Sequence, residues 1–240
     1  MAGEGRNQIS NGAVTMGVRK SARRFIRKIW IDRLKHTYHF IHIPKNGGQS
    51  VRYALQLCGD VSMSTPFHHR YVDIVDTVGE DLKFFCIIRN PWSRTASRYM
   101  FGKQNAQAWP EDDPRRKYIS SVSFDTFVRD QKVLPIPKHP GKPWMGPLSN
   151  WFNQIEWIRD KDGEVVCDCL RLENLSEELS AYLKPRINVP RRNVTQKSYD
   201  YRSMYTDDLA DHVAELFRDD IEYFGFEFEG PATKNIAMLS

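Results

Sequence analysis

Residues 45–50, with the sequence Lys-Asn-Gly-Gly-Gln-Ser, combine residue types that bind anions. They follow an alternating apolar segment, Tyr38–Ile43, that is typical of a β-strand, and they precede Val51–Cys58, whose apolar spacing indicates a helix. Adjacent glycines let the backbone approach a ligand with its N–H groups turned inward, and the N-terminus of the next helix carries a positive partial charge. Lys45 adds a full charge, and Ser50 can cap the helix or bind an oxyanion. The segment therefore predicts an anion-binding loop, with a tight structural turn as the alternative.

A second group of residues follows the apolar run Phe84–Ile88, which indicates a buried strand. Arg89 stands where that strand ends, and Ser97 lies further along, inside the helix-like segment 92–101. Open parallel sheets bind ligands at the carboxyl ends of their strands. A guanidinium can hold a phosphate with two hydrogen bonds, and a serine hydroxyl can complete the contact. Arg89 and Ser97 are thus predicted to bind a phosphate, with a structural salt bridge as the alternative for the arginine.

Three strands and the helices between them must position these groups. We expect the strands at Tyr38–Ile43, Phe84–Ile88 and Val165–Leu172. Residues 102–117 are polar and look irregular. Strands that alternate with helices imply an α/β fold, in which a parallel β-sheet is flanked by helices on both faces. The expected helices are Val51–Cys58, 92–101, Phe124–Arg129, Trp151–Ile158, Glu177–Leu183 and Asp207–Tyr223.

The chain divides into a folded region and two terminal regions. Residues 1–18 are polar and glycine-rich and are predicted to form a mobile tail, and residues 230–240 are predicted to be frayed. Residues 19–35 have the spacing of a basic amphipathic helix, which either contacts an anionic membrane surface or packs on the domain with its charges in water. Residues 36–229 are predicted to form one domain, in which the proline-rich loop 133–147 is a candidate lid over an acceptor.

Composition narrows the class of ligand and the compartment. The 240 residues include 35 Lys and Arg against 30 Asp and Glu, a net charge of +5. Such a small surplus favours a small anionic ligand over a nucleic acid, which needs a denser basic face. No apolar run could span a bilayer and no signal-peptide pattern is visible, so we expect a cytoplasmic protein. Four cysteines fit neither a zinc site nor a disulfide framework, which suits reduced structural thiols: Cys58, Cys86, Cys167 and Cys169.

The two motifs, in this order and each after a predicted strand, resemble those of the sulfotransferases that use 3′-phosphoadenosine 5′-phosphosulfate (PAPS). The resemblance is nearest to the carbohydrate-type branch, which includes heparan 2-O-sulfotransferases and many bacterial relatives, and it covers about residues 38–228. The loop that binds the 5′-phosphosulfate in that family usually reads PKTGGTS, and here it is Pro44–Ser50. The motif for the 3′-phosphate reads roughly RNPxxRxxSxY and is matched by Arg89, Asn90, Pro91, Arg94, Ser97 and Tyr99.

The resemblance implies a P-loop NTPase-like sulfotransferase fold, PAPS as the donor, adenosine 3′,5′-bisphosphate as the product, and no required metal. Asn46 and Gln49 replace the usual threonines of the loop, but their amides can still donate to an oxyanion. Arg191 and Arg192 either close over the nucleotide or contact the acceptor, with a solvated basic loop as the alternative. The residues implied to bind the nucleotide are Lys45, Asn46, Gly47, Gly48, Gln49, Ser50, Arg89, Ser97, Arg191 and Arg192.

Sulfuryl transfer to an alcohol needs stabilisation of the leaving group and a base. Lys45 is expected to stabilise the charge that develops on the leaving phosphate. In the 2-O-sulfotransferases a catalytic histidine is followed by a tyrosine and an aspartate at the spacing of Tyr71 and Asp73, which points to His68, with His69 in reserve. Surface or capping histidines are the alternative reading. His42, on the first strand, is interpreted as structural.

Two other classes of function compete with this one. A nucleotide kinase would need a lysine after the glycines, as in GxxxxGK[ST], and magnesium ligands, whereas here the lysine comes first. A non-catalytic module would bind an anion or a membrane through residues 19–35. The sequence leaves the acceptor open among a polysaccharide, a glycolipid and a small hydroxylated metabolite, and it leaves the oligomeric state open.

Overall fold

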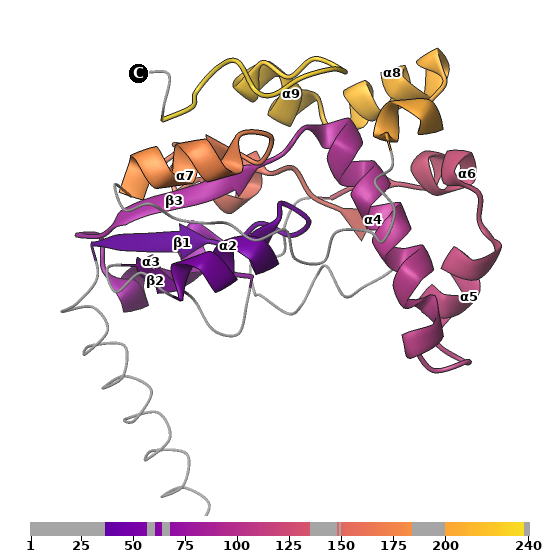
Figure 1. Cartoon of the computed structure of the whole chain (residues 1–240), viewed down its shortest axis with the longest axis horizontal. Helices are drawn as coiled ribbons and strands as arrows, with labels where there is room; N and C mark the ends of the chain where they lie inside the picture. Colours follow the sequence, from indigo (N-terminus) through magenta and orange to yellow (C-terminus); the bar gives the residue numbers. More distant parts are fainter. Residues whose placement is uncertain are drawn as a thin grey trace, which may run out of the picture.

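A parallel four-stranded sheet organises the molecule (Figure 1). A computed structural model describes residues 37–56, 61–63, 68–134, 148, 150–183 and 200–237. The strands lie in the order β2 (Val61–Met63), β1 (Tyr38–Ile41), β3 (Lys83–Ile88) and β6 (Asp168–Arg171), and every pairing is parallel. The predicted α/β class and parallel sheet are confirmed. Strand β2 was not expected, because three residues carry too little alternation to be recognised.

The predicted tail at 1–18 and the helix at 19–35 lie outside the described residues. So do Arg191, Arg192 and all but the first two residues of the expected lid at 133–147.

The order of the strands reverses between β1 and β3. The chain runs from β1 to β2 on one side and then returns to place β3 on the other side of β1, with Ile41 opposite Cys86 at the end of their register. In open parallel sheets the crevice at such a switch point, outside the carboxyl ends of the strands, is where ligands bind. Because β1 and β3 are parallel neighbours, the two predicted anion motifs follow strands that end at one edge of the sheet.

Alternate side chains of the strands enter two separate cores. Phe40, Phe85 and Ile87 pack on one face against α2 (Gly48–Leu55) and α7 (Leu175–Leu183). Ile41, Cys86 and Ile88 pack on the other face, with residues from α3 (Tyr71–Val78), α4 (Pro91–Asn105), α8 (Asp207–Leu216) and α9 (Arg218–Phe224). The expectation of helices on both faces is therefore confirmed.

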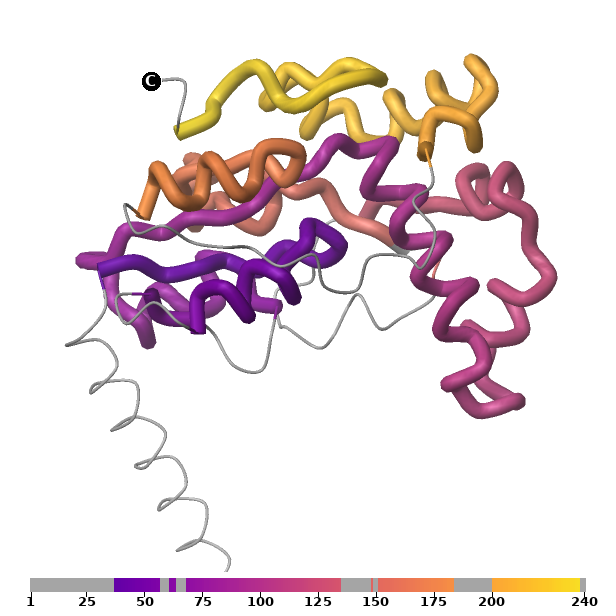
Figure 2. The backbone as a smooth tube through the Cα atoms, in the orientation of Figure 1, coloured from indigo at the N-terminus to yellow at the C-terminus, as the bar shows by residue number. Residues whose placement is uncertain are grey.

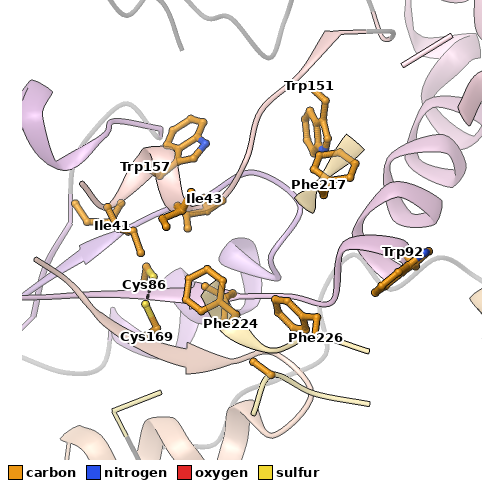
Figure 3. Packing of buried hydrophobic residues seen from close by; sticks show 14 of the residues in the cluster. Ile41, Ile43, Cys86, Trp92, Trp151, Trp157, Cys169, Phe217, Phe224 and Phe226 are labelled. Atoms are coloured by element: carbon orange, nitrogen blue, oxygen red, sulfur yellow. Dashed lines mark hydrogen bonds between the residues drawn. The ribbon is translucent and has the colours of Figure 1, made fainter. Parts of the chain in front are cut away.

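The second core has the cysteines at its centre (Figure 3). Figure 3 shows the sulfur atoms of Cys86 and Cys169 turned toward each other from β3 and β6, and they lie 3.6 Å apart without a disulfide. Cys167 is also a free, buried thiol. These described cysteines fill the core, as the sequence led us to expect. No helix in the described part of the chain has the length and apolar character to cross a bilayer.

Helix α4 begins directly after β3 because Asn90 and Pro91 set its first turn. The Asn90 side-chain oxygen accepts hydrogen bonds from the backbone N–H groups of Trp92 (3.1 Å) and Ser93 (3.2 Å), as an N-cap should. Pro91 at the first helical position has no N–H group that needs a partner. The Asn90 amide also donates to the carbonyl of Gly230 (3.1 Å), so the same residue ties the start of α4 to the C-terminal segment.

The region after α4 is more regular than we predicted. Residues 102–117, expected to be irregular, contain the end of α4, a 3-10 helix η1 (Ala106–Ala108) and the start of α5 (Pro114–Ser121). Asp113 caps α5 through a hydrogen bond from the Arg115 N–H group (2.8 Å). The polar sequence hides these helices because they present little apolar periodicity. The short helix α6 (Phe124–Arg129) has the predicted bounds.

Two predicted helices are wrong in part. Trp151–Ile158 contains a short strand, β5 (Asn150–Trp151), paired with β4 (Lys132–Val133), and only one 3-10 turn, η3 (Ile155–Trp157). The expected helix Asp207–Tyr223 is interrupted at Phe217, whose φ of −115° and ψ of 31° leave the helical region while its side chain is buried. Tertiary packing of these aromatic residues overrides the local pattern.

The C-terminal segment has a defined place, in contrast to the frayed tail expected from residue 230. Ala232 and Ile236 are buried, and the Ala237 N–H group donates to the Cys169 carbonyl (3.1 Å). Figure 2 shows this segment, in yellow, running back along the molecule after α9. A 3-10 helix, η4 (Tyr201–Met204), precedes α8. The tail expectation is thus wrong for residues 230–237, because two of their side chains complete the second core.

Candidate anion-binding site

A cavity of about 450 Å³ lies where β1 and β3 end. The first motif contributes Lys45, Gly47, Gly48 and Gln49 to its wall, and the second contributes Arg89 and Ser97. The two motifs therefore surround one space. The remaining wall residues are His42, Pro44, His68, Arg98, Phe101, Trp109, Arg115, Leu148, Trp151 and Leu172.

The charges on this wall have one sign. Lys45, Arg89, Arg98 and Arg115 line the cavity, and no Asp or Glu does so among the described residues. Low-dielectric walls strengthen the field of such a cluster. The cavity is therefore suited to a ligand with more than one negative charge. Within the described ranges, no group of three or more His, Cys, Asp and Glu side chains could hold a metal ion.

The loop between β1 and α2 requires its two glycines for different reasons. Gly47 has a φ of 71°, in the left-handed region, where it precedes the first residue of α2. A Cβ atom on Gly47 would lie 2.5 Å from Cδ1 of Leu172, and one on Gly48 would lie 1.7 Å from Nε2 of His42. The wall of the cavity is thus made of backbone at these two positions, and any side chain would displace a neighbour.

Lys45 is the first residue of this loop, and both its backbone conformation and its surroundings are unusual for a lysine. Its φ is 69°, and its Nζ atom lies 3.8 Å from the centre of the Phe101 ring. Burial, together with the charges of Arg89 and Arg98, lowers the pKa of Lys45 to about 7. The ammonium form of Lys45 is therefore less favoured than that of an ordinary lysine, and an anion beside Lys45 would stabilise it.

Arg89 reaches from the second motif to the first. Its Nη1 atom donates to the Lys45 carbonyl (3.1 Å), and its Nε atom donates to the Ser93 hydroxyl (3.0 Å). Ser97 lies one helical turn beyond Ser93 on α4 and also lines the cavity. The predicted pair of Arg89 and Ser97 thus lies on one wall, with the guanidinium bonded to both motifs.

The other predicted loop residues differ in their access to the cavity. Gln49 is exposed and lines it. Ser50 is buried and does not line it, although its N–H group donates to the Gly47 carbonyl (2.9 Å) in the first turn of α2. Asn46 is buried with its amide hydrogens bonded to the Ile87 carbonyl (2.7 Å) and to Gln154 Oε1 (2.7 Å). The expected donation from the Asn46 side chain to an oxyanion is therefore wrong, because both donors serve the fold.

Gln154 and Asp220 are central to this region and were not predicted. Gln154 Oε1 accepts from Asn46 Nδ2 and from the Arg89 N–H group (2.9 Å), while its Nε2 donates to the Arg89 carbonyl (2.9 Å) and to Asp220 Oδ2 (3.2 Å). Both residues are completely buried. A single polar residue inside an expected helix gives no periodic signal, so nothing in the sequence pointed to this network.

Arg94, a member of the second motif, has a structural role. It is buried, donates to the carbonyls of Phe152 (2.9 Å) and Pro44 (3.3 Å), and stacks over the Trp151 ring at 4.3 Å. Burial lowers the pKa of Arg94 to about 9, although the carboxylate of Asp220 opposes the shift. Arg94 thus joins the loop after β1 to the segment around Phe152 and does not line the cavity.

Of the two candidate bases, His68 lines the cavity and His69 does not. His68 Nδ1 bonds to the His42 carbonyl at 2.7 Å. Because a carbonyl only accepts, Nδ1 carries the proton and Nε2 is the basic nitrogen of the neutral ring. Burial lowers the pKa of His68 to about 4, while that hydrogen bond opposes the shift. The ring is therefore neutral at neutral pH, the form a general base requires.

His42 is closer to the site than expected. It lines the cavity, its ring centre lies 4.1 Å from that of His68, and its Nδ1 atom has no hydrogen-bond partner among the described residues. Burial, then the charges of His68 and Arg52, hold the pKa of His42 well below its ordinary value. The interpretation of His42 as purely structural missed its place on the wall.

Tyr71 and Asp73 lie at the start of α3 and do not line the cavity. Asp73 accepts hydrogen bonds from the Arg70 backbone N–H group (3.2 Å) and from its guanidinium (2.7 Å), which caps α3. The Tyr71 ring packs edge-on against Phe84 with 4.8 Å between ring centres. These two residues fix the start of α3, three residues after His68.

Part of the cavity wall is aromatic, and one of its rings, Trp109, comes from the region that was expected to be irregular. Phe101, Trp109 and Trp151 form this part. The Arg115 guanidinium lies 5.0 Å from the Trp109 ring and is paired with Asp113 at 2.6 Å, and Arg98 lies 3.6 Å from the Trp151 ring. Flat aromatic rings beside guanidinium groups suit a sugar or a base.

Comparison with known proteins does not identify a family for this chain. No protein-family model, no curated protein and no solved structure matches the chain.

Proposed function

We propose that the protein is a PAPS-dependent sulfotransferase with a P-loop NTPase-like sulfotransferase fold. It transfers a sulfuryl group to a hydroxyl of a carbohydrate or another hydroxylated acceptor. One observation carries the proposal. The parallel neighbours β1 and β3 end beside one cavity, where the glycine loop with Lys45 faces Arg89 and Ser97. A 5′-phosphosulfate and a 3′-phosphate on one nucleotide require two such anion-binding groups.

The positions of Lys45 and His68 support an in-line transfer. The acceptor oxygen forms a bond to sulfur while the bond from sulfur to the bridging phosphate oxygen breaks, and adenosine 3′,5′-bisphosphate leaves. Lys45, half-buried next to the glycine loop, stabilises the charge that develops on that bridging oxygen. His68 Nε2 takes the proton of the acceptor hydroxyl, since Nδ1 already donates to the His42 carbonyl.

The walls of the cavity fit the two substrates in different ways. Arg89 and Ser97 lie where they can hold the 3′-phosphate. The aromatic wall formed by Phe101 and Trp109 suits the ring of a sugar acceptor.

The test is incubation of the protein with isotope-labelled PAPS and a panel of polysaccharides, glycolipids and small hydroxylated metabolites, read by the mass shift of the acceptor. We expect a sulfated product and adenosine 3′,5′-bisphosphate in equal amounts. A thermal-shift titration with the bisphosphate is the first step, because a ligand of the folded state raises the melting temperature. Turnover of ATP that a chelator abolishes, without any transfer from PAPS, would instead identify a kinase.

A further inference from the structure

We infer that Gln154 is a positioning residue that sets the spacing between the two anion-binding strand ends. The nucleotide used in this inference comes from the proposed function, whereas the hydrogen bonds of Gln154 do not depend on that function. Gln154 belongs to neither motif and lies outside the cavity wall. Its side chain is completely buried behind that wall.

The Gln154 amide uses its full hydrogen-bonding capacity on three parts of the chain. Its oxygen accepts from Asn46 Nδ2 (2.7 Å) and the Arg89 N–H group (2.9 Å), and its nitrogen donates to the Arg89 carbonyl (2.9 Å) and Asp220 Oδ2 (3.2 Å). An amide has two lone pairs and two N–H groups, so each one has a partner. One side chain therefore bonds the residue before Gly47, both backbone groups of Arg89, and helix α9.

These hydrogen bonds connect the segments after β1 and β3, beyond the point where the backbone pairing of the two strands ends. The register between β1 and β3 ends with Ile41 opposite Cys86, and the two motifs begin beyond that point. There Asn46 bonds to the Ile87 carbonyl, and Gln154 links Asn46 to Arg89. The distance between the glycine loop and Arg89 therefore depends on side-chain hydrogen bonds, which replace the backbone pairing of the two strands at this point.

Asp220 fixes which way the amide of Gln154 faces. The Asp220 carboxylate also accepts from the backbone N–H groups of Gln154 (2.8 Å) and Ile155 (3.0 Å), so it is held in place. If the amide turned over, its oxygen would face that carboxylate and its nitrogen would face the Arg89 N–H group. Both contacts would be repulsive, so Gln154 has one orientation and Glu cannot replace it.

A fixed spacing matters only to a ligand that contacts both ends at once. A nucleotide with phosphates at both positions must match the gap, whereas a nucleotide with one phosphate can bind at one end and tolerate a change. Loss of the Gln154 link should therefore weaken binding of adenosine 3′,5′-bisphosphate more than binding of 5′-AMP. A general loss of stability would weaken both alike.

The test compares Gln154→Met with Gln131→Met by calorimetric titration. Gln131 is the matched control because it is also buried and donates to the carbonyls of Phe127 (2.8 Å) and Leu148 (3.2 Å), outside both motifs. For Gln154→Met we expect the bisphosphate to bind about tenfold more weakly and 5′-AMP less than about threefold more weakly, with neither changed in the control. Equal losses for the two nucleotides, or no loss, would overturn the inference.

A second variant and a second readout keep the inference independent of folding and of the proposed function. Asn46→Ala removes the bonds from the loop to Gln154 and to the Ile87 carbonyl, leaves the bonds between Gln154 and Arg89 in place, and should show the same selectivity. If the wild-type protein binds no bisphosphate, the proposed function fails, and hydrogen exchange then tests the role of Gln154 by itself. Faster amide exchange in residues 44–50 and 88–90 of Gln154→Met, relative to wild type and Gln131→Met, supports the link, and unchanged exchange contradicts it.

Discussion

The ends of β1 and β3 lie side by side but contribute to the wall of the proposed anion-binding site by different means. After β1 the wall is backbone, because Gly47 and Gly48 have no room for a side chain against Leu172 and His42. After β3 the wall is side chain, because Arg89 and Ser97 supply the polar groups while Asn90 caps α4 behind them. Substitutions at the two glycines should therefore act by adding atoms. Substitutions at Arg89 and Ser97, and at the Lys45 and His68 side chains near the end of β1, should act by removing polar groups.

The histidine beside the end of β1 is expected to give the largest change in rate. His68→Ala removes the proposed base, so we expect turnover to fall by about 10²- to 10⁴-fold while affinity for adenosine 3′,5′-bisphosphate is retained. His69→Ala is the matched control, because His69 does not line the cavity. Steady-state rates with PAPS and an accepted alcohol measure both variants. A large loss in His69→Ala with full activity in His68→Ala would reverse the assignment.

Lys45→Ala tests the charge at the same end. Loss of the ammonium that faces the leaving phosphate should lower turnover by about 10²- to 10³-fold without unfolding the protein. Lys103→Ala is a suitable control, because Lys103 lies on α4 and donates to the Val122 carbonyl (2.9 Å) away from the cavity. Near wild-type turnover of Lys45→Ala with any accepted alcohol would remove this lysine from the mechanism.

Gly48→Ala tests whether the first end depends on the absence of a side chain. Because the new Cβ atom would lie 1.7 Å from Nε2 of His42, the loop or the ring must move, and we expect bisphosphate binding to weaken by at least about tenfold. Gly163→Ala is the control, since a Cβ atom there has no neighbour within 4 Å. Its φ of 91° makes the control less stable but should leave binding intact. Equal binding by both variants, measured by titration, would show that the loop is not a wall of the site.

The pKa of Lys45 predicts how affinity depends on pH. A bound anion would raise the pKa of Lys45 above about 7, so binding at higher pH would take up a proton. Affinity for the bisphosphate should be greatest below pH 7 and should fall by up to about tenfold per unit as the pH rises above it. The phosphates themselves change little there, since their second pKa is about 6. Calorimetry in buffers of different ionisation enthalpy measures the uptake, and Lys45→Arg should abolish it. A flat profile in the wild-type protein would place Lys45 away from the anion.

The sequence predicted what depends on local pattern. Strand β3, the glycine loop and the order of the two motifs followed from apolar runs and punctuating residues, and so did the bounds of α6, Phe124–Arg129. The shared position of Lys45 and Arg89 on one cavity followed from the rule that parallel neighbours end at one edge. These features need no knowledge of distant contacts.

Features that depend on distant packing were not predictable. Gln154 lies far along the chain from both motifs, and its buried amide bonds to Asp220 from α9. Trp151–Ile158 has helical spacing, yet Trp151 joins a short strand and packs against Arg94 and Arg98. The buried polar contacts satisfy groups that approach only after folding, and single-sequence patterns carry no trace of them.

The most direct test of the two-ended site is a titration of wild-type protein and Arg89→Ala with adenosine 3′,5′-bisphosphate and 5′-AMP. If Arg89 binds the 3′-phosphate, its loss should weaken binding of the bisphosphate by about 10- to 100-fold and leave the affinity for 5′-AMP nearly unchanged. Equal weakening of both nucleotides, or wild-type protein that does not prefer the bisphosphate, would contradict the assignment of one phosphate to each strand end.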